Sequence, residues 1–244
     1  MDEEGGRLPS LVSRLSGIFI KSRDWVVSRS GLEDFVKETE EKRVPKHALN
    51  PMYCLGGVTF VALIILGLTG IFLSAHYEPS ILRAQRSIQA ITTEIPFGFY
   101  AKSIHSWSAN IMVVTILLHT LRVFLTGSYK NPREFTWIGG VLLLVFTFSF
   151  IMTGYILLWD DRSRVAATSF AQLVDGIQAI PYVGGLFGWL SAWVTDTFIG
   201  YSFTGEDILT RAYWMHVTVL PLLTLVLLLF HFYLIRKHGI SGPL

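Results

Sequence analysis

Four apolar stretches, each about as long as a membrane is thick, constrain this chain more than any other feature. They cover residues 53–75, 104–125, 137–159 and 213–235, named here spans A, B, C and D. A helix needs about 20 mostly apolar residues to cross the hydrocarbon core of a bilayer. Only 16% of the residues are charged, against about 25% in soluble domains. The sequence therefore predicts an all-α membrane protein, with a four-helix transmembrane bundle over residues 51–244.

Residues 1–50 are expected to form a separate amphipathic segment and connector. Leu11, Leu15, Ile18, Phe19 and Val26 recur at roughly helical spacing, with basic residues between them. This pattern is typical of a helix that lies on a membrane surface, although an ordinary polar tail would also fit. No apolar stretch separates a basic start from a small-residue cleavage site, so we expect no secretory signal peptide.

The long connection between spans C and D, residues 160–212, contains a further apolar region at residues 165–194. Glycines and Pro181 interrupt this region, and a proline inside a helix kinks or breaks it. The region is therefore too broken to span the membrane. We expect a helical hairpin that lies at the membrane interface.

Basic residues near the span ends indicate an orientation. Cytoplasmic loops of membrane proteins carry an excess of lysine and arginine. The N-terminal segment, the B–C loop and the C-terminus all carry such residues, among them Lys46, Arg133 and Lys237. Four spans place these three segments on one side. We therefore expect a multi-pass protein of the cell (cytoplasmic) membrane with both termini in the cytoplasm.

Spans B and D each carry two histidines. His105 and His119 are fourteen residues apart in span B, and His216 and His231 are fifteen apart in span D. Both spacings are close to four helical turns, so each pair is predicted to lie on one face of its helix. Spans B and D run in the same direction. His105 and His216 are therefore expected near the outer surface, and His119 and His231 near the cytoplasmic surface.

One histidine from each of two helices at one depth is what bis-histidine haem ligation requires. Imidazole is a standard axial ligand of haem iron. An ionisable residue inside a membrane is costly, so the default hypothesis is that it has a function. Two neutral imidazoles close both axial positions, so such a haem transfers electrons and does not activate oxygen. The pattern predicts a dihaem bundle with two non-covalent b-type haems stacked across the membrane.

Spans A and C have no histidine but repeat the same period in glycine. Gly56 and Gly70 in span A are fourteen residues apart, as are Gly140 and Gly154 in span C. Glycine permits close approach, so we expect the haem edges to rest at these positions. Close packing of small residues between membrane helices is the alternative.

Haem propionates are anionic and need partners at the membrane edges. Lys102 and Arg211 precede the outer histidines, and Arg122 follows His119 at the inner level. These three residues are candidate propionate partners. Basic side chains also reach toward the membrane surface for their own solvation, so the pattern fits both interpretations.

The segments "KSIHSWSAN", "LLHTLRVFLTGSYKNPREFTWIGG", "MTGYILLW" and "LTRAYWMHVTVLP" carry a family resemblance. They resemble cytochrome b of cytochrome bc and b6f complexes, in the short, cytochrome b6-like form of Gram-positive menaquinol:cytochrome c reductases. The resemblance covers roughly residues 40–244. It implies an electron-transfer subunit of a quinol:cytochrome c (or plastocyanin) oxidoreductase, a translocase that is not active alone.

In that family, electrons cross from an outer quinol-oxidation site to an inner quinone-reduction site, and protons are translocated. The resemblance implies that His105 and His216 hold a low-potential haem, and that His119 and His231 hold a high-potential haem. It also implies partners: a Rieske iron–sulfur protein, a separate subunit IV-like chain with the quinol-oxidation motif, and a cytochrome c or f-type subunit. We expect a dimeric complex in a lipid membrane, and no nucleic acid.

Cys54 is the single cysteine, so an internal disulfide is excluded. By itself a lone cysteine at a span start is a small hydrophobic residue. The segment "NPMYCLGGVTF" resembles the cytochrome b6 segment whose cysteine bonds covalently to a further haem near the inner haem. The resemblance thus implies a third, covalent haem at Cys54, with Arg236 and Lys237 available to a propionate or a quinone.

The chain also departs from the family pattern. Leu158 stands where the family has proline before Trp159, and Lys102 and Ser106 stand where the short form often has arginines. The hairpin would supply a wall of the outer quinol site, with Phe170, Leu173 and Ile177 as candidate residues. Two other interpretations remain: the dihaem b membrane anchor of a formate dehydrogenase or hydrogenase, and a haem-free structural or transport protein.

Overall fold

The computed structural model describes residues 7–30, 50–180, 188–189 and 206–239. Every regular element within these ranges is a helix. The chain divides into two compact units, Met1–Lys46 and His47–Leu244.

The first unit contains helix α1, Arg7–Ser30. Its side chains Leu15, Ile18 and Phe19 are 61%, 62% and 73% exposed, so they form an uncovered apolar face on this helix. The predicted helix is therefore present. Its predicted place on a membrane surface stays a prediction.

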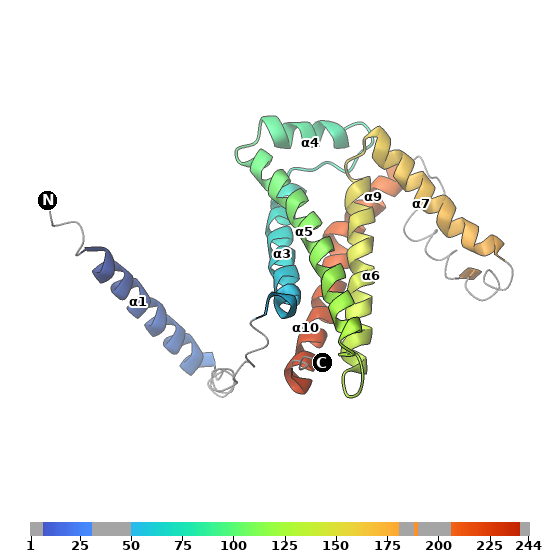
Figure 1. The fold of residues 1–244 in the computed structure, drawn as a ribbon. Coiled ribbons are helices and arrows are strands. Elements are labelled where there is room, and N and C mark those ends of the chain that lie inside the picture. Colours follow the sequence, from blue (N-terminus) through green and yellow to red (C-terminus); the bar gives the residue numbers. More distant parts are fainter. Residues whose placement is uncertain (1–6, 31–49, 181–187, 190–205, 240–244) are drawn as a thin grey trace. The chain divides into compact units, whose positions relative to one another are not determined.

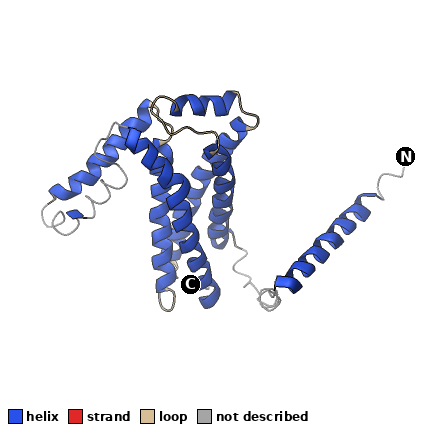
Figure 2. Cartoon of the chain, turned by 180° about the vertical axis from the view of Figure 1, so that it is seen from behind, coloured by secondary structure: helices blue, strands red, loops and turns tan. Residues whose placement is uncertain are grey.

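The second unit contains four helices long and apolar enough to cross a membrane, among the residues that the structure describes. They are α3 (Pro51–Ser74), α5 (Gly98–Leu125), α6 (Glu134–Ile156) and a continuous helix over Ile208–His238. Helix α3 packs along α5, and α6 packs along α10 (Leu220–His238) (Figures 1 and 2). The four predicted spans are thus confirmed.

Local signals set the helix starts. The Asn50 side chain accepts a hydrogen bond from the Met52 N–H at 3.0 Å, and Pro51 follows at the first helical position. Helix α5 begins at Gly98, six residues before the predicted start of span B, after Phe97 in the left-handed conformation with φ 64°. A Cβ at Gly98 would lie 1.8 Å from the Ile91 carbonyl oxygen, so this turn requires glycine.

The A–B connection contains a short helix that was not predicted, α4 (Ala84–Thr93). It lies across the end of the bundle where α5 begins (Figure 1). Ala84, Ser87 and Ile91 are buried along one side. With Ile88 and Ile91 as its only large apolar residues, this ten-residue segment gave a signal too weak to separate from a loop.

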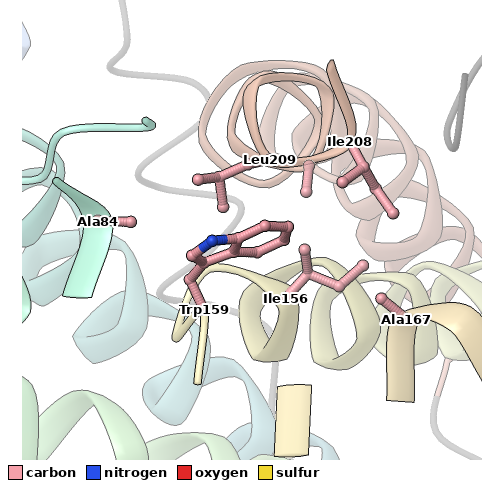
Figure 3. Close-up of a cluster of buried hydrophobic side chains, with 7 residues drawn as sticks. Ala84, Ile156, Trp159, Ala167, Ile208 and Leu209 are labelled. Carbon is pink, nitrogen blue, oxygen red and sulfur yellow. The ribbon is translucent and has the colours of Figure 1, made fainter. Parts of the chain in front are cut away.

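A cluster of buried side chains joins α4, α6, α7 (Asp161–Ala179) and α9 (Glu206–Trp214) at this end of the bundle (Figure 3). Its members are Ala84, Ile156, Trp159, Ala167, Ile208, Leu209 and Ala212. Helix α7 is the first half of the predicted hairpin. Pro181 and nearly all of the second half lie outside the described residues.

The C-terminal end of α6 has its own turn. Helix α6 ends at Ile156, three residues before the predicted end of span C, and Trp159 is 5% exposed with φ 49°. The Leu158 N–H donates to the Tyr155 carbonyl at 3.1 Å. Proline has no N–H to donate, so the leucine at this family proline position supplies a hydrogen bond to the turn.

The connection then enters α7 through Asp160. Its Oδ1 accepts a hydrogen bond from the Ser163 N–H at 2.7 Å. An acceptor at a helix N-terminus satisfies one of the open backbone donors. The same hydrogen bond favours the charged carboxylate and lowers the pKa of Asp160.

Candidate functional site

The four histidines lie on α5 and on the helix formed by α9, residues Met215–Val219 and α10. We name His105 and His216 the outer pair, and His119 and His231 the inner pair, after the predicted orientation. The ring centroids of the outer pair are 6.4 Å apart. Two metal–imidazole bonds of about 2 Å each, plus the two ring radii, account for a separation of this size. The spacing therefore suits one metal between two rings.

The donor set also distinguishes a haem from a bare metal ion. Within the described residues, no group of three or more His, Cys, Asp or Glu side chains could hold a metal. A site of only two imidazoles needs a metal that brings its own remaining ligands. Haem iron does so, because the porphyrin supplies the equatorial nitrogens and the protein supplies the axial ligands.

Each histidine faces at least one glycine on a helix without histidines. A Cβ at Gly70 would lie 3.4 Å from the His105 ring, and a Cβ at Gly154 would lie 2.7 Å from the His216 ring. At the inner level, Gly56 and Gly140 face His119 and His231, with corresponding distances of 3.1 and 3.3 Å. The glycines thus make room for the imidazole rings. Their predicted contact with haem edges stays a prediction.

Two threonines bind the outer pair, and nothing in the histidine spacing predicted them. Thr69 Oγ1 lies 2.9 Å from His105 Nδ1, and Thr153 Oγ1 lies 3.0 Å from His216 Nδ1. Thr69 directly precedes Gly70, and Thr153 directly precedes Gly154. This repeated Thr-Gly pair in spans A and C is the signal that could have found them.

The helix that carries His216 contains a π-helical turn, Met215–Val219, which was not predicted. Its hydrogen bond runs from the Leu220 N–H to the Met215 carbonyl. Pro221 follows at the start of α10. Proline cannot donate to the preceding turn, and its ring clashes with the carbonyl four residues earlier. A wider turn relieves this clash and absorbs one extra residue.

The π turn explains the unequal histidine spacings. At about 100° per residue, fourteen residues end about 40° short of four turns, whereas fifteen end about 60° beyond them. The two pairs would therefore differ in direction if both helices were regular. The π turn contains His216 and opens the helical segment that leads to His231. Because it absorbs one residue, the fifteen-residue spacing acts as fourteen.

The predicted basic residues lie near the histidines along the sequence. Lys102, Arg211 and Arg236 are three to five residues from a histidine of the same helix. Arg122 has its guanidinium 4.7 Å from the centroid of the Tyr53 ring, a cation–π contact between α5 and α3. A propionate contact for each of these residues stays a prediction.

Cys54 is exposed in the first turn of α3. It lies two residues before Gly56, which faces His119. Cys54 is therefore at the end of the bundle that holds the inner pair. The predicted covalent attachment of a haem to Cys54 stays a prediction.

A tyrosine pair closes the opposite end of the bundle. The rings of Tyr77 and Tyr213 stack with centroids 5.7 Å apart. Tyr77 donates its hydroxyl to the Leu157 carbonyl at 2.8 Å, and Tyr213 donates to the Ser74 carbonyl at 3.3 Å. Burial raises the pKa of Tyr77, which keeps its hydroxyl protonated as a donor. The pair ties together the ends of α3, α6 and α9 near the outer histidines.

Comparison with known proteins gives a consistent result. The family described as "Cytochrome b/b6/petB" matches residues 39–239. The chain is similar to cytochrome b6 of a Desmonostoc species and of Mastigocladus laminosus, each 43% identical over 222 residues, 91% of this chain and 98% of the relative. Cytochrome b6 of Acaryochloris marina is 44% identical over 225 residues, 92% of this chain and 99% of the relative.

A solved structure is also similar. A chain of "Hyperthermophilic respiratory Complex III" matches with a TM-score of 0.80 and 30% identity over 90% of the present chain. The match covers 56% of that chain, so the present chain spans about half of its length. Helix α1 lies before the residues that the family match covers.

Proposed function

The chain belongs to the cytochrome b/b6 family and is an electron-transfer subunit of a quinol oxidoreductase complex, and we propose that it holds two b haems. Family membership implies b-type haems. In the proposal, His105 and His216 are the axial ligands of an outer haem, and His119 and His231 those of an inner haem. The 6.4 Å separation of the outer rings is the observation that carries the proposal.

The protein's own groups prepare these ligands. Thr69 and Thr153 orient the outer rings through Nδ1, which leaves each Nε2 available to a metal. Gly56, Gly70, Gly140 and Gly154 leave space beside the rings. A haem iron with two imidazole ligands accepts and releases one electron and has no open axial position. Fourteen residues of helix correspond to about 21 Å. Two haems at these levels would therefore replace one long electron transfer across the membrane by shorter ones.

The direction of electron flow is part of the proposal. The two ligand levels would serve to carry electrons from a quinol-oxidation site on the outer side to a quinone-reduction site on the cytoplasmic side. The partners would be a Rieske iron–sulfur protein, a subunit IV-like chain and a cytochrome c or f-type subunit, in a dimeric complex. Basic residues at the B–C loop and the C-terminus support a cytoplasmic location of both termini in the cell membrane.

The family match favours this function over the anchor of a formate dehydrogenase or hydrogenase. A spectrum of the purified protein tests the haem proposal. We expect a reduced-minus-oxidised b-type difference spectrum and two non-covalent haems per chain. An absence of haem absorbance in well-folded protein would disprove it, and quinol:cytochrome c reductase activity of the isolated complex would test the full reaction.

Gly154 offers a test of the ligand geometry. We expect Gly154→Val to remove about one of the two non-covalent haems, because even a Cβ at this position would lie 2.7 Å from the His216 ring. Gly67→Val is the matched control, since a Cβ at Gly67 meets nothing within 4 Å. Haem per chain is measured in both purified variants. Full haem content in Gly154→Val, or an equal loss in both variants, would argue against the assigned geometry.

We propose a third haem bound covalently through Cys54, with Arg236 and Lys237 near a propionate or a quinone. Arg122 would serve a propionate of the inner haem. The support is the exposure of Cys54 and its place two residues from Gly56, at the inner level. Lys102 and Arg211 would serve the outer haem. The covalent haem at Cys54 extends beyond the two-haem proposal, whereas the roles of the basic residues rest on it.

Acidified acetone distinguishes covalent from non-covalent haem, because it extracts only the latter. We expect one haem to stay with wild-type protein after extraction and none to stay with Cys54→Ala. The two extractable haems should be retained before extraction in both proteins. Haem that remains bound in Cys54→Ala, or its absence from extracted wild type, would exclude attachment at Cys54.

A further inference from the structure

The hydrogen bonds of the histidine rings differ between the two levels. At the outer level both Nδ1 atoms lie within hydrogen-bond distance of a threonine hydroxyl, Thr69 or Thr153. At the inner level, no threonine hydroxyl lies within hydrogen-bond distance of the buried Nδ1 atoms of His119 and His231. The two pairs of imidazoles therefore differ in whether a threonine hydroxyl lies beside Nδ1.

The direction of the outer hydrogen bonds follows from the threonines' second contacts. Thr69 donates its hydroxyl hydrogen to the Ile65 carbonyl at 2.7 Å, and Thr153 donates to the Ser149 carbonyl at 2.7 Å. A hydroxyl has one hydrogen to donate and two lone pairs. Each oxygen is therefore left to accept from the Nδ1–H of its histidine. This arrangement fixes the tautomer in which Nε2 is the free ligand atom.

The sequence around the glycines shows why only one level has these bonds. Thr69 and Thr153 directly precede Gly70 and Gly154, which face the outer rings. Fourteen residues earlier on each helix, the corresponding positions are Leu55 and Gly139. Neither residue has a side-chain hydrogen-bonding group. The glycine that faces the histidine is thus present at both levels, whereas a threonine precedes it at the outer level alone.

We propose that Thr69 and Thr153 are positioning residues that lower the reduction potential of the haem held by His105 and His216 relative to the other haem. The inference rests on the proposed bis-histidine ligation. An Nδ1–H that donates a hydrogen bond makes its imidazole a more basic ligand. A more electron-donating ligand stabilises the oxidised iron, so the potential falls, and second-shell hydrogen bonding is a recognised means of tuning it.

Removing the hydroxyls tests the proposal by redox titration of purified protein. We expect Thr69→Val and Thr153→Val to raise the potential of the same haem and to narrow the gap between the two haems. The expected change is roughly tenfold in the equilibrium constant of reduction, about 59 mV for a one-electron couple. Thr69→Ser and Thr153→Ser keep the hydroxyl and should keep the wild-type potentials.

Two other threonines provide matched controls. Thr59 on α3 and Thr147 on α6 also donate to the carbonyl four residues earlier. Their hydrogen bonds are to Leu55, Thr115 and Leu143, and not to a histidine. Thr59→Val and Thr147→Val should leave both potentials unchanged. Equal shifts in the control and test variants, or unchanged potentials in Thr69→Val and Thr153→Val, would overturn the proposal.

Gly139 permits the reciprocal experiment, which does not depend on removing any native contact. A Cβ at Gly139 would lie 3.8 Å from His231 Nδ1, so a threonine hydroxyl at this position can reach that nitrogen. We expect Gly139→Thr to lower the potential of the inner haem relative to Gly139→Val, which has the same shape without the hydroxyl. Equal potentials in these two variants would contradict the proposal even if the valine variants at Thr69 and Thr153 lose haem.

The outcomes separate this inference from the proposed function. Purified protein that contains no haem, or whose haems are not bound by these four histidines, would contradict the proposed function itself. Protein with two bis-histidine haems whose potentials do not respond to the threonine hydroxyls would retain the proposed function and exclude the inference.

Discussion

His105→Ala and His216→Ala are each expected to remove the same haem from the purified protein, although the two residues are 111 positions apart. The reason is that their rings face each other at 6.4 Å, and a haem with one axial ligand missing loses its strongest attachment. His119→Ala and His231→Ala are expected to remove the other haem. Each variant should retain about half of the non-covalent haem.

Redox titration of the remaining haem identifies which one is lost. The first two variants should retain one midpoint potential, and the second two should retain the other. Electron transfer across the membrane should be lost in all four. His76→Ala is the control, because His76 is exposed in the turn after α3 and its Nδ1 contacts the Phe72 carbonyl of that helix at 2.9 Å. Loss of the same haem in His105→Ala and His119→Ala would disprove the pairing.

Deleting one residue from the helix that carries His216 and His231 should affect haem content differently in α10 and in the π turn. We expect deletion of Leu228 in α10 to remove one haem, because a missing residue in an α-helix rotates everything beyond it by about 100°. Deletion of Val219 in the π turn should preserve both haems, because a five-residue π turn can shorten to a regular α-helical turn. Pro221→Ala is included in both variants so that the regular turn can form.

Haem per chain in the two purified variants is the measurement, with the Pro221→Ala protein as the parent. Equal haem loss in both deletions would mean that the π turn does not compensate for the extra residue. Full haem content after deletion of Leu228 would mean that the alignment of His216 with His231 is not required. Both results would contradict the explanation of the fifteen-residue spacing.

The π turn also shows the limit of counting residues. Spacings of fourteen and fifteen both round to four turns, so the sequence predicted that each histidine pair shares a face. The rounding hid a difference of about 100° between the two helices. Pro221 was the available signal, but a proline can produce a kink, a break or a wide turn. Packing of the surrounding helices selects among them.

Other features were missed for different reasons. Helix α4 is short and polar, and it is stabilised by burial of Ala84, Ser87 and Ile91 against other elements. The positive φ of Trp159 depends on the buried cluster around it, which residues from four separate helices form. Neither feature has a strong local pattern, because the energy that stabilises each comes from contacts distant in sequence.

The sequence by itself determined the four spans, because the length of an apolar helix is set by bilayer thickness. It also determined the depth of each histidine and glycine, since position along a helix follows directly from residue number. Only the tertiary structure decided that His105 faces His216 and Gly70, and that the Thr69 hydroxyl lies within hydrogen-bond distance of its ring. Such contacts depend on the rotation of each helix about its axis, which packing between helices sets.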